Sequence, residues 1–235
     1  MKPARSSRAV PPAGRRPGSP PVGILISGRG SNALAILDRI AAGRLRARAA
    51  LVISNEPGAP GLTAARARGV STLLLDHRDS ATREEHDRRM AAALDAAGVQ
   101  VVCLAGYMRL LSPWFVGRYR GRILNIHPSL LPAFPGKDPH RMAIASGVKL
   151  SGCTVHFVDE GVDSGPIILQ EAVPVLESDT PETLSARILT VEHEAYSRAI
   201  ALCLGGRLRI KGRRVLGATA VTRARPPRRP KRPPR

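Results

Sequence analysis

The sequence has few aromatic residues and no long apolar run. Aromatic residues make up 3% of its 235 residues, so a core must be built from Leu, Val, Ile and Ala. No apolar run approaches the roughly 18 residues that a membrane-spanning helix needs, and we therefore expect no membrane association. The N-terminal stretch lacks the apolar segment of a secretory signal, so we expect a cytoplasmic protein.

Cysteine is also scarce. The chain has three cysteines, Cys103, Cys153 and Cys203, which lie fifty residues apart within apolar segments. This spacing is wrong for a zinc site, and an odd, scattered set argues against a disulfide framework. We expect buried thiols in a reducing compartment and no metal.

Acidic residues are absent from both ends of the chain. Residues 1–22 hold five basic residues, residues 222–235 hold seven, and neither stretch contains Asp or Glu. These ends carry most of the net charge of +19 and 11 of the 21 prolines, and they have too few apolar residues to form a core. We predict disordered tails at 1–21 and 217–235 around one domain at 22–216. The rest of the chain has a modest charge, so we expect no specific nucleic acid partner.

The first half of the chain alternates apolar runs with helical patterns. Continuous apolar runs of this kind are typical of strands that are buried on both faces. The alternation predicts an α/β fold, with a Rossmann-like, mostly parallel sheet and helices on both faces. The predicted strands are residues 22–27, 47–55, 71–76, 99–106 and 121–127, and the predicted helices are residues 33–42, 61–70 and 82–98.

The pattern changes in the second half. Two longer apolar stretches, residues 152–160 and 165–175, are joined by the loop GVDS and predict antiparallel strands added to the sheet. Residues 178–204 predict a long helix with Thr180 as its N-cap, followed by Pro at the first helical position. The apolar–basic alternation of residues 207–216 predicts a small terminal hairpin.

A glycine turn, GRGSN at residues 28–32, connects the first predicted strand to the first predicted helix. Its backbone N–H groups and the start of the helix make an anion site. Ser31 and Asn32 add side-chain donors. These residues favour phosphate binding by Gly30, Ser31 and Asn32.

The same turn leaves two alternatives open. Gly28, Gly30 and Ala33 fit a dinucleotide fingerprint, for which Asn55 or Glu56 at the end of the next strand would be the ribose-binding residue. The turn can also be only a tight connection without a ligand.

Two polar side chains, Asn125 and His127, interrupt the apolar strand ILNIH. Side chains alternate along a strand, so these two share one face. Burying either without a partner costs roughly 1–3 kcal/mol. They are therefore either members of a functional site or polar groups that close the strand end against backbone partners. Asp163, on the later loop GVDS, can reach the same cleft.

Four segments extend this interpretation to a family. GRGSN, AGYMRLLS, NIHPSLLPAFPG and HFVDEGVDSGPI occur in this order, and together they resemble the phosphoribosylglycinamide formyltransferase family over about residues 22–210. The resemblance implies the formyltransferase fold and transfer of a formyl group from 10-formyltetrahydrofolate to the amine of 5-phosphoribosylglycinamide in de novo purine synthesis. It implies small-molecule substrates, no metal, and a monomer or homodimer.

The resemblance also assigns site residues. It implies that Asn125, His127 and Asp163 are catalytic. An amide N–H and an imidazolium suit the oxyanion that forms when an amine attacks a formyl carbon, and a carboxylate suits the proton that the amine loses. The implied ribonucleotide-binding residues are Gly30, Ser31, Asn32, Leu189, Thr190, Val191 and Glu192. The implied folate-binding residues are Arg83, Met108, Arg109, Leu110, Leu111, Asn125, Asp159, Glu160, Gly161, Val162 and Asp163.

Other functions remain open at this point. Methionyl-tRNA formyltransferase shares the Asn, His and Asp residues, but it adds a C-terminal tRNA-binding domain for which few residues remain after the long helix. A formyltetrahydrofolate hydrolase adds an N-terminal regulatory domain, for which the first 22 residues are too few. A non-enzymatic nucleic-acid-binding protein is suggested by net charge alone, and the predicted domain lacks a basic surface motif with aromatic residues.

Overall fold

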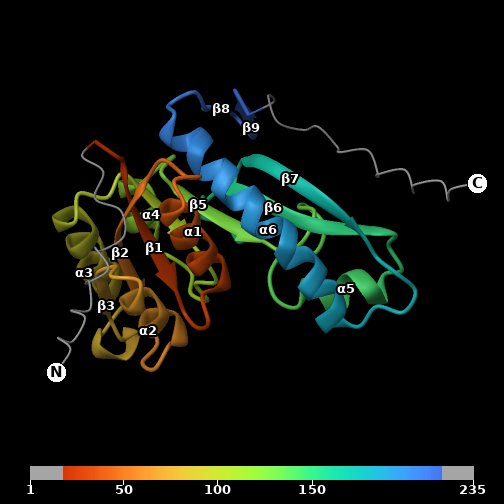
Figure 1. Cartoon of the computed structure of the whole chain (residues 1–235), viewed down its shortest axis with the longest axis horizontal. Coiled ribbons are helices and arrows are strands. Elements are labelled where there is room, and N and C mark those ends of the chain that lie inside the picture. The colour runs from red at the N-terminus through yellow and green to blue at the C-terminus, as the bar shows by residue number, and fades with distance from the viewer. Residues whose placement is uncertain (1–17, 219–235) are drawn as a thin grey trace, which may run out of the picture.

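The computed structural model describes residues 18–218, and Figure 1 shows how the elements are arranged. The two predicted tails lie outside the described residues, apart from residues 18–21 and 217–218. One nine-stranded sheet crosses the described part of the chain in the order β3-β2-β1-β4-β5-β6-β7-β9-β8. The mixed α/β fold predicted from the sequence is confirmed.

The first five strands are parallel, as predicted. They are β1 (Pro21–Ile26), β2 (Arg48–Ser54), β3 (Thr72–Leu74), β4 (Val101–Leu104) and β5 (Ile123–His127). The chain adds β2 and β3 on one side of β1, and then β4 and β5 on the other. Open sheets bind ligands where the strand order reverses in this way, at the carboxyl ends of the strands.

The remaining strands give the sheet its antiparallel part. β6 (Leu150–Phe157) pairs antiparallel with β5, and β7 (Ile167–Pro174) pairs antiparallel with β6. The predicted terminal hairpin is present as β8 (Arg209–Lys211) and β9 (Arg214–Leu216), and β9 also pairs with β7. β6 ends before the predicted position because the Phe157 N–H donates to the Pro166 carbonyl at 2.9 Å and closes the loop.

Helices cover both faces of the sheet and divide the core into two clusters. On one face, α1 (Ser31–Ala41), α2 (Pro60–Ala67) and α6 (Pro181–Leu204) pack on the sheet, and Figure 1 shows α6 crossing its antiparallel part. On the other face lies α3 (Arg83–Ala96) with α4 (Pro113–Arg118). Both clusters consist mainly of Leu, Ile, Val and Ala, as the scarcity of aromatic residues requires.

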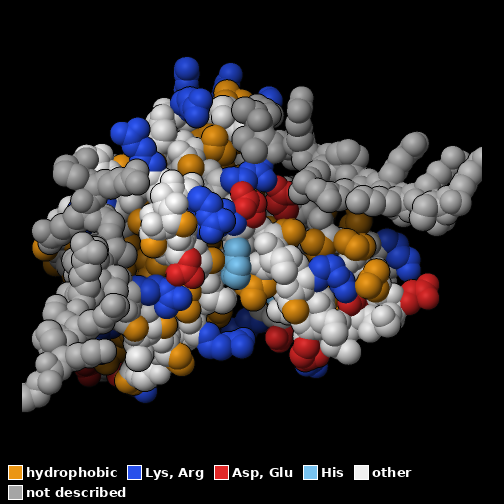
Figure 2. All heavy atoms as spheres, in the orientation of Figure 1, with side chains coloured by type: hydrophobic (Ala, Val, Ile, Leu, Met, Phe, Trp, Pro, Cys, Tyr) orange, Lys and Arg blue, Asp and Glu red, His pale blue; other side chains and the backbone are white. Residues whose placement is uncertain are grey.

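The surface of α6 carries paired charges. Arg39 of α1 lies 2.6 Å from Glu194 of α6, and Arg198 of α6 pairs with Glu171 of β7. Figure 2 shows basic and acidic side chains side by side on this face. Paired charges at the surface contribute little stability, so apolar burial accounts for most of the attachment of α6.

Three short helices were not predicted. They are η1 (His77–Asp79), α4, and α5 (Pro139–Ala145). Helices this short do not show a helical period in the sequence. The predicted cap of α6 is confirmed, because the Thr180 hydroxyl accepts the Thr183 N–H at 3.3 Å and the Thr183 hydroxyl accepts the Thr180 N–H at 3.0 Å.

Candidate active site

Asn125 and His127 lie on β5, and their side chains share a face of the sheet, as predicted. His127 is the last residue of the strand and is 5% exposed, whereas Asn125 is partly buried. The antiparallel register of β5 and β6 places His156 directly opposite Asn125. Directly opposed residues present their side chains on the same face, so β6 contributes a second imidazole to the site.

Asp163 reaches this face from the loop between β6 and β7. Its Oδ1 atom accepts the Asn125 Nδ2–H at 3.3 Å, and its Oδ2 atom lies 3.2 Å from His127 Nδ1. The Gly136 N–H also donates to Oδ2, at 2.9 Å. The backbone of Asp163 is left-handed, with φ of 50°. The structure therefore brings the three residues predicted to be catalytic into direct contact.

The carboxyl group of Asp163 is held in its ionised form. Burial acts to raise its pKa, but the contact with His156, the Gly136 N–H and the positive charge available on His127 outweigh burial and hold the pKa below its usual value. His156 Nε2 lies 3.7 Å from Asp163 Oδ1. At neutral pH this carboxylate is an acceptor between two imidazoles.

His127 is engaged at both ring nitrogens. Nε2 donates to the Phe134 carbonyl at 2.8 Å, because a carbonyl oxygen can only accept, and Nδ1 faces Asp163. Two acceptors around one ring match the hydrogen-bonding pattern of an imidazolium ion. Any hydrogen bond from His127 to a substrate must therefore be shared with one of these acceptors.

His156, which the sequence suggested to be a strand histidine with satisfied hydrogen bonds, was not among the residues assigned to the site. Its Nδ1 atom donates to the Phe157 carbonyl at 2.9 Å, which directs Nε2 toward Asn125 Nδ2 at 3.3 Å. The signal in the sequence was its place in the apolar strand before Asp163. That signal could not show which residue of β5 stands opposite, because this depends on the register of two strands.

The turn after β5 is fixed by side chains of β6 and β7. The Thr154 hydroxyl accepts the Leu131 N–H at 3.0 Å and donates to the Ser129 carbonyl at 2.7 Å. The Gln170 amide donates to the Leu131 carbonyl and to Thr154 Oγ1, both at 2.9 Å. The same turn supplies the Phe134 carbonyl and Gly136 N–H, so it positions the partners of His127 and Asp163.

The glycine turn and α6 meet beside this site. Gly30 has φ of 66°, a left-handed conformation that suits glycine, and α1 begins at Ser31. Asn32 Nδ2 donates to Glu192 Oε2 at 2.8 Å, although these residues are 160 positions apart. Two residues predicted to bind the ribonucleotide are thus in contact.

Glu192 is a buried carboxyl group with spare hydrogen-bonding capacity. It is 6% exposed, and burial raises its pKa, while the hydrogen bond from Asn32 acts in the opposite direction. Asn32 Oδ1 is also buried and has no hydrogen-bond partner among the described residues. Of the other predicted residues on α6, Thr190 is exposed and Leu189 and Val191 are partly buried.

The dinucleotide alternative does not fit the end of β2. Asn55 is 1% exposed, and its side chain accepts from Ser27 Oγ at 2.6 Å and donates to Glu56 Oε1 at 3.0 Å. A ribose would have to compete with these bonds.

The predicted folate-binding residues lie in three places. Met108 to Leu111 lie in the loop between β4 and α4, residues 159–163 lie between β6 and β7, and Arg83 is the exposed first residue of α3. Met108 is 81% exposed, Leu110 57% and Val162 52%. These three large apolar side chains are open to solvent and therefore accessible to a ligand. The structure does not join Arg83 to the other two groups, so its assignment depends on the resemblance.

Two further features bear on the type of site. Within residues 18–218, no group of three or more His, Cys, Asp or Glu side chains is arranged to hold a metal ion. In the same part of the chain, no helix combines the length and the apolar character needed to cross a membrane.

Comparison with known proteins identifies the family. The model of the formyl transferase family matches residues 22–200, which include nearly all of β1, all of β2 to β7 and most of α6. The chain belongs to the formyl transferase family. This formyltransferase therefore has the fold and the class of activity that the sequence predicted.

Two relatives are similar to this chain over most of their own length. Phosphoribosylglycinamide formyltransferase of Escherichia coli (strain K12) is 43% identical over 187 residues, which cover 80% of this chain and 88% of that protein. The solved structure of glycinamide ribonucleotide transformylase 1 from Symbiobacterium toebii is 53% identical, with a TM-score of 0.83 over 85% of this chain and 94% of that one.

A longer relative matches over only part of its length. The trifunctional purine biosynthetic protein adenosine-3 of Drosophila melanogaster is 50% identical over 187 residues. These cover 79% of this chain but span only 14% of that protein.

Proposed function

We propose that this formyltransferase transfers the formyl group of 10-formyltetrahydrofolate to the amine of 5-phosphoribosylglycinamide, in the cytoplasm, as a step of purine synthesis. The observation that carries the proposal is the contact of Asn125, His127 and Asp163 on one face of the sheet. The names of the relatives with similar length support this choice of substrates.

Asn125, His127 and Asp163 can stabilise the two charges that the reaction creates, a negative charge on the formyl oxygen and a positive charge on the amine. The neutral amine attacks the formyl carbon, a C–N bond forms, and the formyl oxygen becomes an oxyanion. Asn125 Nδ2–H and His127 Nδ1–H, which both face Asp163, are each shared between the oxyanion and that carboxylate. A single donor to an oxyanion typically contributes about 10²–10³ in rate.

Proton transfer completes the reaction. The attacking amine becomes cationic and releases a proton to Asp163, directly or through water, which is possible because the carboxyl group is ionised. The bond between the formyl carbon and the folate nitrogen then breaks, and that nitrogen takes up a proton from the same acid–base group. The products are a formamide and tetrahydrofolate, and no proton is left over.

Two surfaces next to these residues suit the two substrates. The N-terminus of α1, with Gly30, Ser31 and Asn32, offers N–H groups to the phosphate. Glu192 and the unpartnered Asn32 Oδ1 offer acceptors to ribose hydroxyls. The exposed apolar residues of the Met108–Leu111 loop offer a surface to the folate heterocycle.

The test is a direct comparison of acceptors. Purified protein and 10-formyltetrahydrofolate are mixed with either 5-phosphoribosylglycinamide or methionyl-tRNA, and tetrahydrofolate release is followed. We expect turnover with the ribonucleotide only. Turnover with methionyl-tRNA, or hydrolysis at the same rate without any acceptor, would refute the proposed substrate.

A further inference from the structure

The loop between β4 and α4 is held at two backbone N–H groups by side chains from other elements. The Met108 N–H donates to Ser27 Oγ at 2.8 Å, and the Ser112 N–H donates to Asp87 Oδ2 at 2.6 Å. Between these points the side chains of Met108 and Leu110 are exposed. The loop therefore has fixed ends and an open apolar tip.

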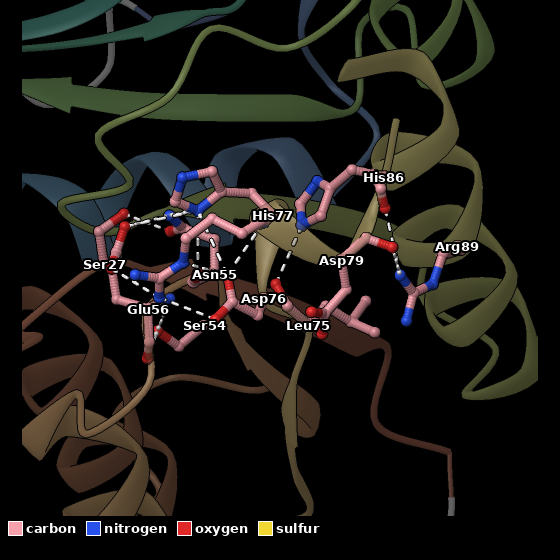
Figure 3. A network of polar contacts seen from close by, with 12 residues as sticks. Ser27, Ser54, Asn55, Glu56, Leu75, Asp76, His77, Asp79, His86 and Arg89 are labelled. Atoms are coloured by element: carbon pink, nitrogen blue, oxygen red, sulfur yellow. Dashed lines mark hydrogen bonds and ion pairs between the residues drawn. The ribbon is translucent and has the colours of Figure 1, made fainter. Parts of the chain in front are cut away.

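Ser27 is the first of these anchors, at the end of β1. Its hydroxyl proton is committed to Asn55 Oδ1 at 2.6 Å, so its lone pairs are left for the Met108 N–H. Asn55 is fixed in turn by Glu56 at 3.0 Å, and its carbonyl lies 3.2 Å from His77 Nδ1. Figure 3 shows the side chains of Ser27, Asn55 and His77 directed toward one another.

Asp87 is the second anchor, on α3. Asp87 and its neighbour His86 are each 1% exposed, and Ser112 is 2% exposed. His86 Nε2 donates to the Leu75 carbonyl at 3.0 Å, as Figure 3 shows, and its Nδ1 atom lies 3.4 Å from Asp87 Oδ1. Burying a carboxyl group costs free energy unless its oxygens are hydrogen-bonded. Here one of the two oxygens accepts the Ser112 N–H of the loop.

We propose that Ser27 and Asp87 are positioning residues for the folate co-substrate. They hold the Met108–Leu111 loop in its binding shape before the ligand arrives, so that binding does not have to order the loop. This inference depends on the proposed function, because it assigns the loop to 10-formyltetrahydrofolate. The side chains act through the backbone of the loop, by way of the Met108 and Ser112 N–H groups.

The inference predicts different effects on the binding of the two substrates. The glycine turn is held by bonds of its own, since the Gly61 N–H donates to the Gly28 carbonyl at 3.1 Å and the Leu34 N–H to the Gly30 carbonyl at 2.9 Å. Loss of either anchor should therefore weaken folate binding and leave ribonucleotide binding unchanged.

The experiment uses matched pairs of variants. Ser27→Ala removes the acceptor, whereas Ser27→Thr keeps a hydroxyl. Asp87→Ala removes the acceptor, whereas Asp87→Asn keeps an oxygen for the Ser112 N–H and adds an NH2 group for His86 Nδ1. Ser197→Ala is the control, because it removes a buried hydroxyl that bonds only within α6, at 3.1 Å from the His193 carbonyl.

We measure KM for each substrate, kcat, and the Kd of 10-formyltetrahydrofolate alone. Both alanine variants should raise the folate KM and Kd by about two- to tenfold, the equivalent of one hydrogen bond. The ribonucleotide KM should not change, and Ser27→Thr, Asp87→Asn and Ser197→Ala should resemble the wild type. If Asp87→Ala does not fold, the Ser27 pair decides the result.

Three results would overturn the inference. One is an unchanged folate KM and Kd in Ser27→Ala, and another is an equal rise in KM for both substrates. The third is a wild-type protein that neither binds 10-formyltetrahydrofolate nor transfers its formyl group, which would refute the proposed function as well. In the first two cases wild-type turnover shows that the proposed function stands.

Discussion

The Nδ1 atom of His127 lies 3.2 Å from the Oδ2 atom of Asp163. One residue ends a buried strand and the other lies in a loop with a left-handed backbone, so the fold and not the local sequence creates the contact. Since the Phe134 carbonyl occupies the other ring nitrogen, His127 is oriented from both sides. Orientation of this kind is what a catalytic acid–base pair requires.

The first prediction concerns the charge of Asp163. Asp163→Asn should lower kcat by about 10² or more, because proton transfer is lost, while both KM values change little. The fold should survive, since Asn tolerates the φ of 50° at this position. Single-turnover formyl transfer and a circular dichroism spectrum are the measurements. A variant with near wild-type turnover would mean that the loop only closes the site.

The second prediction is that Asn125, His127 and Asp163, which we propose to be catalytic, act as a unit. Asn125→Ala and His127→Ala should each lower kcat by about as much as Asp163→Asn does. Asn125→Ala combined with Asp163→Asn should cost less in free energy than the two single changes added together, because groups acting on one transition state are not additive. A double-mutant cycle on single-turnover rates measures the coupling. Strict additivity would contradict it.

The third prediction concerns the burial of Glu192. Burial raises its pKa in the folded state, so the folded protein holds this proton more tightly than the unfolded chain does. The stability contributed by Glu192 is therefore fully present below the unfolded pKa of about 4.3, and it is lost as pH rises through the folded pKa. Glu192→Gln has no such loss, so its stability relative to wild type should increase from pH 4 to pH 8.

The same substitution, Glu192→Gln, should weaken binding of the ribonucleotide. An amide replaces one acceptor oxygen by a donor, and we expect a ribonucleotide KM that is about ten- to a hundredfold higher. Urea unfolding at both pH values and steady-state kinetics are the measurements. If the difference in unfolding free energy between Glu192→Gln and the wild type does not vary with pH, burial does not raise the pKa of Glu192.

The fourth prediction concerns the glycine turn. Gly30→Val should raise the ribonucleotide KM far more than the folate KM, because it distorts the backbone N–H groups that we propose bind the phosphate. Valine is strained at φ of 66°, so Gly98→Val, at φ of 68° and with open space around it, is the matched control for strain alone. If both variants change the ribonucleotide KM equally, or if Gly30→Val affects both substrates alike, the turn is not the phosphate site.

The fifth prediction concerns the ends of the chain. A truncated chain of residues 18–218 should fold and keep its turnover, because both core clusters and the site lie within it. Leu216 pairs with Arg209 in the terminal hairpin, so a cut before that residue should lower the unfolding temperature. Loss of turnover on removal of residues 1–17 and 219–235 would show that the ends contribute to function.

The sequence by itself determined the features that depend on neighbouring residues. Apolar runs predicted β1 to β5, the period of two placed Asn125 and His127 on one face, and Thr180 predicted the start of α6. Each of these is local, because strand alternation and helix capping depend on residues a few positions apart. The family segments added roles to residues that the pattern had already set apart, such as Asn125 and His127, and assigned others that it had not, such as Arg83 and Glu192.

The tertiary structure decided which distant residues meet. His156 joins the site only because β6 pairs antiparallel with β5 in one register. Asp87 and Ser27 reach the loop between β4 and α4 only because α3 and β1 flank it in space. Strand order and register depend on how all the apolar faces pack at once, and a shift of one residue would turn His156 to the other face. No local pattern records that choice, so these contacts could be seen only in the folded chain.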